Sequence, residues 1–421
     1  MELSNKKEYS IFQKILLNPI FLFLLVASSM WSVWDITKSE SSDELLMEKA
    51  NELAQKFIIT DGHIDVPWRL HKGGYEDLSV RTPGGDFDYV RATEGGLDVP
   101  FMSIYVPATY QVTGGAKAMA EELIGMVERI TTDHPDKFEI AYNVSDADRI
   151  VSEGKIALPM GMENGAPIEG DLKNIEYFHN KGISYITLTH SKDNAICDSS
   201  YDTTGTHQGL SSFGAEVVTE MNRVGVMVDI SHVSDNAFYQ VMDITKVPAI
   251  ASHSSCRHFT PGFERNMSDD MIKRLAENGG VIQINFGSSF VTKSSQDKRT
   301  ANGEKVSQYA EENNLESDDP KVQEFAKQVA EDNPVFCDVT DVADHIDRVV
   351  ELAGIEHVGF GSDYDGVGDT LPYGLKDPSD FPNLIYHLLK RGYSEEDIEK
   401  ICYKNVWRVW KATEEFANSQ S

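Results

Sequence analysis

Short apolar runs recur along most of this chain, separated by longer polar and mixed stretches. Eight runs predict β-strands, at residues 57–60, 99–106, 156–160, 184–189, 225–230, 247–252, 281–286 and 357–360. Most of these runs are continuously apolar rather than alternating between apolar and polar positions. That pattern is typical of strands buried on both faces of a parallel sheet.

Amphipathic helices are predicted between the strands. Apolar positions recur at helical spacing in residues 116–130, 211–223, 234–242, 268–277 and 339–352. Two of these segments begin with a candidate N-cap residue, Ser234 and Ser268. The eightfold alternation of strand and helix predicts an α/β fold, a single (β/α)8 TIM-type barrel with insertions.

Two segments interrupt this alternation. Residues 71–95 are rich in Gly, Asp and Arg and are expected to form an excursion after the first strand. Residues 288–336 form an acidic insertion with few apolar residues, which we expect to be a long loop that acts as a lid or an interface. Since the chain has no internal repeat and no low-complexity linker, residues 45–415 are predicted to form one domain.

The N-terminal 34 residues differ from the rest of the chain. Three lysines precede a mainly apolar stretch at residues 15–34, which includes small residues at 27–29. This pattern predicts a signal peptide and export of the main domain to a periplasmic or extracellular location. The apolar stretch also approaches the length that crosses a bilayer, so residues 1–34 are expected to be either a cleaved signal peptide or a retained membrane anchor.

The charge of the chain is strongly acidic, with 38 Lys and Arg against 68 Asp and Glu, a net charge of −30 over 421 residues. Such a surface argues against nucleic acids and anionic membranes as partners. Membrane contact is expected only if the N-terminal segment is retained as an anchor.

Cysteine usage leaves two possibilities open. The four cysteines are Cys197, Cys256, Cys337 and Cys402. In an exported protein they could form up to two disulfides, with three possible pairings, or they could remain free buried thiols.

Metal-binding side chains stand at the ends of six of the eight predicted strands. In chain order they are His63, Asp65, Glu163, His190, His232, His253, Asp363 and Asp365. A single histidine at a strand end is usually an ordinary hydrogen-bonded residue, but here four of the chain's 12 histidines stand at four strand ends. In a barrel these positions converge on one mouth, so together they predict a metal site.

The ligand types indicate the kind of metal centre. His63 and Asp65 are two residues apart and therefore point to the same face of an extended segment. Imidazole and carboxylate without thiolate suit zinc or a similar divalent ion in a catalytic role. The set exceeds what one tetrahedral ion needs, so two ions that share a carboxylate and a hydroxide are the simplest arrangement, which predicts hydrolysis. Cys256 follows His253 closely but is expected on the helix side rather than among the ligands.

Six motifs in the same order resemble those of the renal (membrane) dipeptidases, which are amidohydrolase-like metallopeptidases. The motifs are Asp-Gly-His-Ile-Asp, Gly-Met-Glu-Asn-Gly, Leu-Thr-His-Ser, Asp-Ile-Ser-His-Val-Ser, Ser-His-Ser-Ser and Gly-Phe-Gly-Ser-Asp-Tyr-Asp-Gly. These motifs extend over nearly the whole chain that follows residues 1–34. The His-x-Asp pair is itself discriminating, since many related barrel hydrolases carry His-x-His there.

The resemblance implies two zinc ions in each chain. His63 and Asp65 would hold one ion, and His232 and His253 would hold the other. Glu163 would bridge both ions together with a water or hydroxide, and so would belong to the metal-binding and the catalytic residues alike.

The resemblance also implies roles towards the substrate. His190 would contact the substrate and stabilise the oxyanion, and Asp363 would pass a proton from the attacking water to the leaving amine. Arg265 would clamp the C-terminal carboxylate of a dipeptide through its guanidinium. The alternative for Arg265 is a surface arginine that pairs with Glu264 or Asp269.

Two further properties follow from the same resemblance. Members of the family are commonly dimers, so a homodimer is expected. The insertion at 288–336 looks longer and more acidic than in mammalian members, and the lipid-anchor tail of those members is absent from the C-terminus. Any tethering would then depend on the N-terminal segment.

The sequence therefore predicts zinc-dependent hydrolysis of dipeptides to free amino acids. One alternative is another amidohydrolase reaction at the same centre, on a β-lactam, a lactone or an N-acyl-amino acid, since each needs the same hydroxide and polarised carbonyl. The second is a metal-binding or peptide-binding relative that has lost catalysis. The presence of every ligand position and of Asp363 argues against the second.

Overall fold

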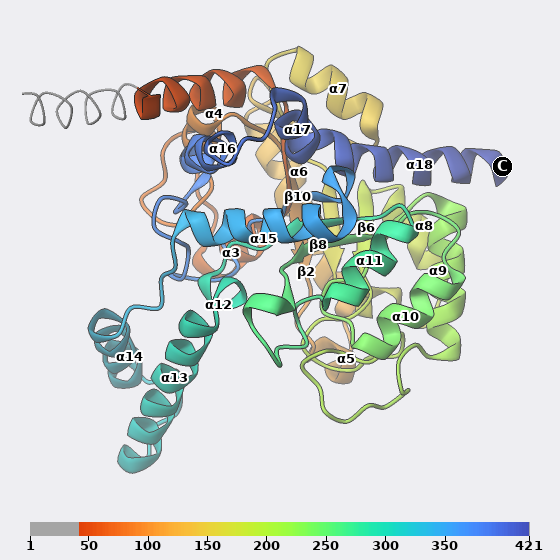
Figure 1. Ribbon diagram of the computed structural model, residues 1–421. Coiled ribbons are helices and arrows are strands. Elements are labelled where there is room, and N and C mark those ends of the chain that lie inside the picture. Colours follow the sequence, from red (N-terminus) through yellow and green to blue (C-terminus); the bar gives the residue numbers. More distant parts are fainter. Residues whose placement is uncertain (1–41, 421) are drawn as a thin grey trace, which may run out of the picture.

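In the computed structural model, which describes residues 42–420, eight parallel strands close into a barrel surrounded by helices (Figure 1). The order around the barrel is β1-β10-β9-β8-β7-β6-β5-β2. These strands are β1 (Ile59–Ile64), β2 (Leu97–Tyr105), β5 (Met160–Glu163), β6 (Ile183–Thr187), β7 (Met227–Asp229), β8 (Ile250–Ser254), β9 (Val281–Ile284) and β10 (Val358–Phe360). The predicted (β/α)8 barrel is confirmed.

The third predicted strand was misplaced. Residues 156–160 contain β4 (Ile156–Ala157), which pairs with β3 (Phe138–Glu139) in a separate two-stranded sheet, and only the first residue of the barrel strand β5. Pro159 separates β4 from β5, because proline has no backbone N–H to donate to a ladder. Glu163 is consequently the last residue of a barrel strand rather than a residue beyond it.

Helices surround the barrel and occupy the connections between strands. They are α3 (Val66–Gly73), α4 (Tyr89–Gly95), α5 (Tyr110–Thr113), α6 (Ala116–Asp133), α7 (Val144–Ser152), α8 (Lys173–His179), α9 (Ser212–Val224), α10 (Asp235–Ile244), α11 (Asp269–Glu277), α12 (Ser288–Val291), α13 (Lys293–Asn313), α14 (Pro320–Asp332), α15 (Val339–Ala353), α16 (Phe381–Lys390), α17 (Glu395–Glu399) and α18 (Asn405–Gln420). Short 3-10 turns are η1 (Ala166–Ile168), η2 (Arg257–Phe259), η3 (Ile355–His357) and η4 (Pro378–Asp380), and η5 (Lys400–Lys404) is a π-helical turn. Both predicted serine caps are confirmed, since Ser234 and Ser268 accept hydrogen bonds from the N–H groups of Ala237 and Met271.

One end of the barrel is closed by helix α18. Its Trp407 and Trp410 belong to a buried cluster with Val99 and Phe101 of β2. The Trp407 indole donates to the hydroxyl of Thr60 near the start of β1, at 3.0 Å. The apolar plug therefore lies at the amino ends of the strands, which leaves the carboxyl ends for the polar site.

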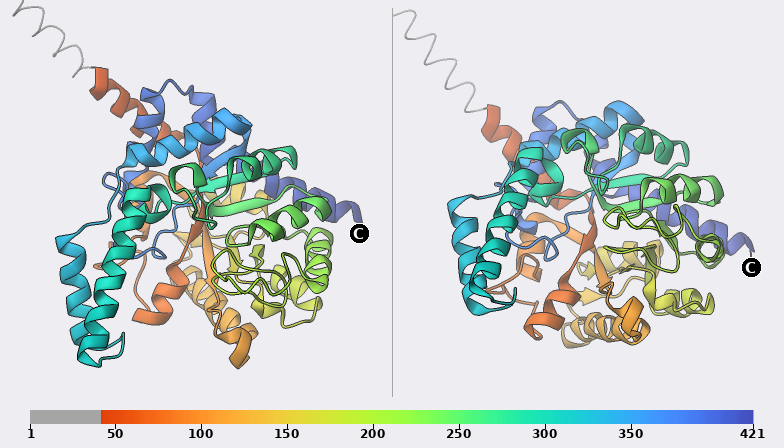
Figure 2. Two further views of the ribbon diagram at one scale, coloured as in Figure 1. Left: turned by 60° about the horizontal axis from the view of Figure 1, so that its bottom comes forward. Right: turned by 90° about the horizontal axis from the view of Figure 1, so that it is seen from below.

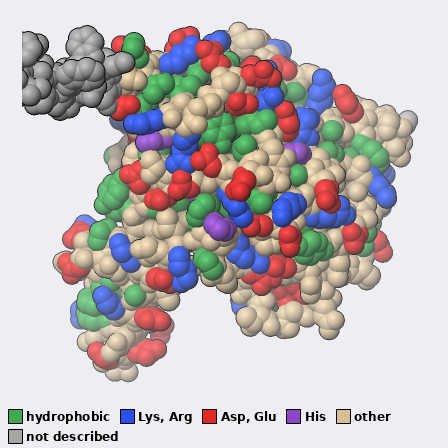
Figure 3. Space-filling view, viewed as in Figure 1, with side chains coloured by type: hydrophobic (Ala, Val, Ile, Leu, Met, Phe, Trp, Pro, Cys, Tyr) green, Lys and Arg blue, Asp and Glu red, His purple; other side chains and the backbone are tan. Residues whose placement is uncertain are grey.

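The acidic insertion is helical, so the expectation of a long loop was wrong. Helices α12, α13 and α14 occupy most of residues 288–336, and α13 and α14 form a hairpin that projects from the barrel (Figures 1 and 2). Tyr309 and Phe325 stack between them with ring centroids 4.2 Å apart. Acidic and basic side chains both lie on the surface of this hairpin (Figure 3). Helix α13 was missed because it has no apolar stripe: Ser295 is its one buried residue.

The structure decides between the two alternatives for the cysteines. All four cysteines are buried and free, which agrees with the thiol alternative. Burial raises the pKa of the thiols of Cys256 and Cys402.

The predicted signal peptide or anchor at residues 1–34 lies outside the described residues. Between residues 42 and 420, the structure has no helix that combines the length and the apolar character of a membrane span.

Candidate metal centre and active site

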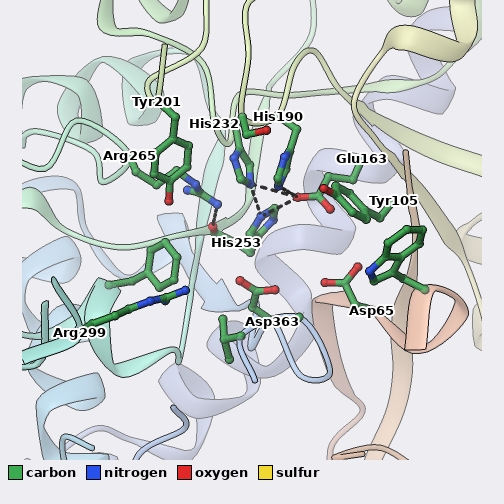
Figure 4. Close-up of a pocket in the computed structure, with 15 residues that line it drawn as sticks. Asp65, Tyr105, Glu163, His190, Tyr201, His232, His253, Arg265, Arg299 and Asp363 are labelled. Carbon is green, nitrogen blue, oxygen red and sulfur yellow. Dashed lines mark hydrogen bonds and ion pairs between the residues drawn. The ribbon is translucent and has the colours of Figure 1, made fainter. Parts of the chain in front are cut away.

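A polar cavity of about 510 Å³ opens at the carboxyl ends of the barrel strands (Figure 4). Its lining residues are Asp65, Trp68, Tyr105, Glu163, His190, Ser191, Tyr201, His232, His253, Arg265, Phe290, Arg299, Asp363, Gly366 and Val367. Seven of the predicted site residues are among them, and His63 lies fully buried beside them. The barrel thus brings together side chains that are up to 300 residues apart in the chain.

Glu163 lies at the centre of the histidine cluster, with its two oxygens facing different partners. Oε2 is 3.5 Å from Nε2 of His63. Oε1 is 3.1 Å from Nε2 of His232 and 3.4 Å from Nε2 of His253. A carboxylate that bridges two ions must direct its two oxygens to different groups of ligands, and Glu163 has this arrangement. The burial of Glu163 does not by itself explain why its two oxygens face different histidines.

Three groups of side chains have the spacing of metal ligands. They are His63 with Glu163 and His253, Glu163 with His190 and His232, and His63 with Asp65 and Asp363. Nε2 of His63 is 3.5 Å from Oδ2 of Asp65, so the pair predicted from the His-x-Asp spacing lies on one face. His190 is near the same centre, with Nε2 3.6 Å from Oε1 of Glu163.

Hydrogen bonds behind the ligands select which ring nitrogen faces the cavity. The Tyr185 hydroxyl donates to the carbonyl of Gly62 at 3.0 Å and lies 2.8 Å from Nδ1 of His63, so it accepts the Nδ1 proton. Similarly, Ser252 donates to Asp229 at 2.6 Å and accepts from Nδ1 of His253 at 2.8 Å. With Nδ1 engaged in this way in both histidines, Nε2 is the ring nitrogen that faces the cavity and would bind a metal ion after losing any proton it carries.

Several buried polar atoms of the cluster have no hydrogen-bond partner among the described residues. They include Nε2 of His63, Oδ1 of Asp65 and Nδ1 of His232. Leaving such atoms unpaired is costly, and a bound cation removes the cost. The donor set of imidazoles and carboxylates therefore fits one or two divalent ions.

Burial and neighbouring charges shift the pKa values of several members of the cluster. Burial lowers the pKa of His253 to about 3 and holds that of His232 well below its usual value. Burial alone would raise the pKa of Glu163, but the neighbouring His190 and His63 and the hydrogen bonds from His232 and His253 hold it well below its usual value. Although burial would lower it, Tyr185 and the carboxylates of Glu163 and Asp65 hold the pKa of His63 well above its usual value. The cluster consequently combines an ionised carboxylate with neutral imidazoles at His232 and His253, whereas His63 would lose a proton when it binds a metal ion.

Asp363 enters the cavity from a strained turn after β10. Its φ of 64° lies in the left-handed region, which costs a non-glycine residue about 1–3 kcal/mol. Asn285 donates to its Oδ2 at 2.7 Å, and burial raises its pKa to about 7. A carboxyl group with such a pKa suits proton transfer near neutral pH.

Gly366 follows in the same turn and packs against two carboxylates. A Cβ at this position would lie 2.1 Å from Oδ2 of Asp65 and 2.2 Å from Oδ1 of Asp363. Glycine is therefore required there for the two carboxylates to lie close together.

Asp365 was expected at the barrel mouth with the other candidate ligands, but its carboxylate lies outside the histidine cluster. Its carboxylate accepts from the backbone N–H of Asp86 at 2.7 Å and from Arg69 at 3.3 Å. It anchors the glycine-rich excursion after the first strand and takes no part in the histidine cluster. Asp363 and Asp365 both have a left-handed φ, 64° and 65°, so the turn is not extended and their side chains do not share one face.

Arg265 lies in the cavity, and its alternative as a surface residue is wrong. The side chain is 3% exposed, and it donates to Oγ of Ser254 at 2.7 Å and to the carbonyl of His253 at 2.8 Å. Glu264 instead accepts from a backbone N–H at 3.0 Å, and Asp269 pairs with an arginine of α15. Arg265 is thus held directly beside His253, one of the candidate metal ligands.

Several residues of the site could not be recognised from the sequence. Tyr105, Tyr201 and Trp68 line the cavity as aromatic walls, and Arg299 reaches it from helix α13. The aromatic residues carried no motif, and Arg299 lay in a segment expected to be a loop. Cys256 is not among the metal-binding groups, as expected: its Sγ is 3.6 Å from the carbonyl of His345.

Known proteins share both the sequence pattern and the fold. Residues 47–421 match the model of the membrane dipeptidase family, peptidase family M19. The chain is 31% identical over 393 residues to an uncharacterised dipeptidase of Schizosaccharomyces pombe, covering 88% of this chain and 84% of the relative. It is 31% identical over 374 residues to a dipeptidase of Claviceps purpurea, covering 86% and 78%.

A solved structure agrees with these relatives. The probable dipeptidase PvdM of Pseudomonas aeruginosa superposes with a TM-score of 0.77 at 26% identity, covering 89% of this chain and 100% of that one. This chain therefore belongs to the membrane dipeptidase family of metallopeptidases and is a peptide-bond hydrolase.

Proposed function

We propose that the protein hydrolyses dipeptides with a free C-terminus at a centre of two zinc ions. The observation that carries this proposal is the position of Glu163, whose two oxygens face separate histidine partners. His63 and Asp65 would hold one ion, His232 and His253 the other, and Glu163 both. Two bound ions supply a hydroxide at neutral pH and polarise a carbonyl.

The chain's own residues position the substrate and move protons. Asp363, whose pKa burial raises to about 7, would accept a proton from the attacking water and deliver it to the leaving amine. His190 lies on the wall of the cavity next to Glu163, where its ring can contact the scissile carbonyl oxygen. Arg265 offers its guanidinium to the C-terminal carboxylate.

The buried guanidinium of Arg265 also favours dipeptides over the other amidohydrolase substrates. A lactone has no free carboxylate, so it would leave this buried cation without a counter-ion. β-Lactams and N-acyl-amino acids that carry a carboxylate remain the second candidate class, because the same clamp can hold them.

The test combines metal analysis with turnover. The purified protein is expected to hold two zinc ions per chain and to hydrolyse L,L- or L,D-dipeptides, with activity lost to a chelator and restored by zinc. Arg265→Ala should raise KM for dipeptides about tenfold or more, since it removes hydrogen bonds to a charged group. Arg129→Ala, a surface change of the same kind, is the matched control. Fewer than two ions together with no chelator-sensitive hydrolysis would contradict the proposal, and an unchanged KM would contradict the clamp.

Export and a homodimeric assembly complete the proposal. Export is supported by the basic and apolar pattern of the N-terminal segment, and the homodimer by the family to which the chain belongs. Fractionation of cells and light scattering of the purified protein test these two statements separately.

A further inference from the structure

A second arginine enters the cavity from the helical insertion. Arg299 of α13 lines the same cavity as Arg265 and is solvent-exposed at its mouth. Its Nη1 donates to Oγ of Ser289 at 2.9 Å, which holds the guanidinium at the end of helix α12. The acidic insertion therefore presents a cation at the mouth of the cavity.

Neither arginine of the cavity has a carboxylate partner. The carboxylates that line the cavity, Asp65, Glu163 and Asp363, all belong to the metal-binding groups. Between residues 42 and 420, no Asp or Glu lies within ion-pair distance of Arg265 or Arg299. Two guanidinium groups are thus available to an anionic ligand.

The two arginines lie on the same side of the cavity. In Figure 4, Arg265, Tyr201 and Arg299 are grouped opposite Asp65 and Tyr105. The centre of the Phe290 ring is 5.6 Å from the Arg265 guanidinium. Ser289, which precedes Phe290, accepts a hydrogen bond from Arg299. The guanidiniums therefore flank one aromatic wall, and a residue whose main-chain carboxylate is bound by Arg265 would place its side chain near Arg299.

We propose that Arg299 binds the acidic side chain of the substrate's C-terminal residue, so that the enzyme prefers dipeptides ending in Glu or Asp. This inference rests on the proposed dipeptidase function, because it takes Arg265 as the site of the main-chain carboxylate. Two separated cations match the two carboxylates of a dicarboxylic amino acid, whereas a neutral C-terminal residue would use only one of them.

The experiment compares kcat/KM for Ala-Glu and Ala-Gln, which differ in charge but hardly in shape. The zinc-loaded wild-type protein should favour Ala-Glu by about tenfold, the lower end for a hydrogen bond to a charged group, because Arg299 is exposed. Arg299→Gln should remove this preference by lowering kcat/KM for Ala-Glu and leaving Ala-Gln within about twofold. Lys305→Gln, an equal change of charge at an exposed position of the same helix, should leave both values unchanged.

Two further variants separate charge from structure. Arg299→Lys should restore part of the preference, and Arg299→Glu should shift it towards Ala-Lys. Equal loss with both substrates in Arg299→Gln would overturn the inference and assign Arg299 to the main-chain carboxylate or to the structure of the mouth. A wild-type protein that cleaves Ala-Gln as well as Ala-Glu would also overturn it, while leaving dipeptide hydrolysis intact. No cleavage of any dipeptide would instead refute the proposed function.

Discussion

The hydroxyl of Tyr185 lies 2.8 Å from Nδ1 of His63 and thereby directs the opposite ring nitrogen into the metal cluster. Tyr185 fits inside the barrel because position 161 is glycine, where a Cβ would lie 1.9 Å from the tyrosine ring. The orientation of His63, a candidate metal ligand, thus depends on a tyrosine and a glycine from two other strands, β6 and β5.

Tyr185→Phe is expected to weaken metal binding while the barrel stays folded. Loss of the acceptor frees His63 to change its tautomer, and the loss of such a supporting bond costs about 10-fold to 100-fold in metal affinity. Competition with a chelator measures the affinity, and circular dichroism reports the fold. Tyr177→Phe removes a surface hydroxyl that donates to Glu121 and serves as the control. Equal zinc affinity in Tyr185→Phe and wild type would show that the bond to His63 has no role in binding.

Asp363→Asn is expected to separate catalysis from metal binding. Because asparagine cannot take up a proton, kcat should fall by about 100-fold to 10,000-fold, with the zinc content unchanged. Zinc content is measured by elemental analysis and kcat on a dipeptide. Loss of zinc from the variant would instead make Asp363 a ligand with His63 and Asp65, a group whose spacing the structure also allows.

Gly366→Ala is expected to disrupt the site without a change of charge. The added Cβ would force apart the carboxylates of Asp65 and Asp363, so metal affinity should fall by about 10-fold to 100-fold. Gly125→Ala adds the same methyl group in helix α6, where no atom beyond the adjoining helix backbone lies within 4 Å, and should leave zinc binding as it is. Wild-type affinity in Gly366→Ala would mean that the turn relaxes at no cost.

Asp98 should make stability fall as the pH rises from about 4 to about 7. Burial raises its pKa from 3.8 to about 7, although the N–H of Ile59 donates to the carboxylate. In this pH range the unfolded state releases the proton and the folded state retains it, so folding is progressively disfavoured up to the folded pKa.

Asp98→Asn removes this titration and keeps an acceptor for Ile59. The gain in melting temperature over wild type should therefore be close to zero near pH 4 and largest above pH 7, as measured by thermal unfolding across that range. Asp136→Asn, on the exposed surface, is the control. A gain in melting temperature that does not vary with pH would show that Asp98 is ionised in the folded protein at every pH measured.

The barrel and most members of the candidate metal cluster could be predicted from the sequence because their signals are local. A strand covered on both faces must be apolar throughout, so runs such as residues 225–230 and 281–286 are visible without any knowledge of their neighbours. The side chain that follows each run then lies at the same end of the barrel, which brings His232 and His253 together whatever the details of packing.

Other features were decided only by the tertiary structure. Helix α13 has no apolar stripe, and it is held by its contacts with α12 and α14 rather than by a buried face of its own. Its path and the position of Arg299 were therefore not predictable from the sequence. Asp363 and Asp365 are equivalent in sequence, but the backbone of the turn sends one to the metal cluster and the other to Arg69. The sequence by itself determined which chemical groups reach the barrel mouth. The tertiary structure decided which of them face one another, because that depends on distances between strands, turns and helices that are remote along the chain.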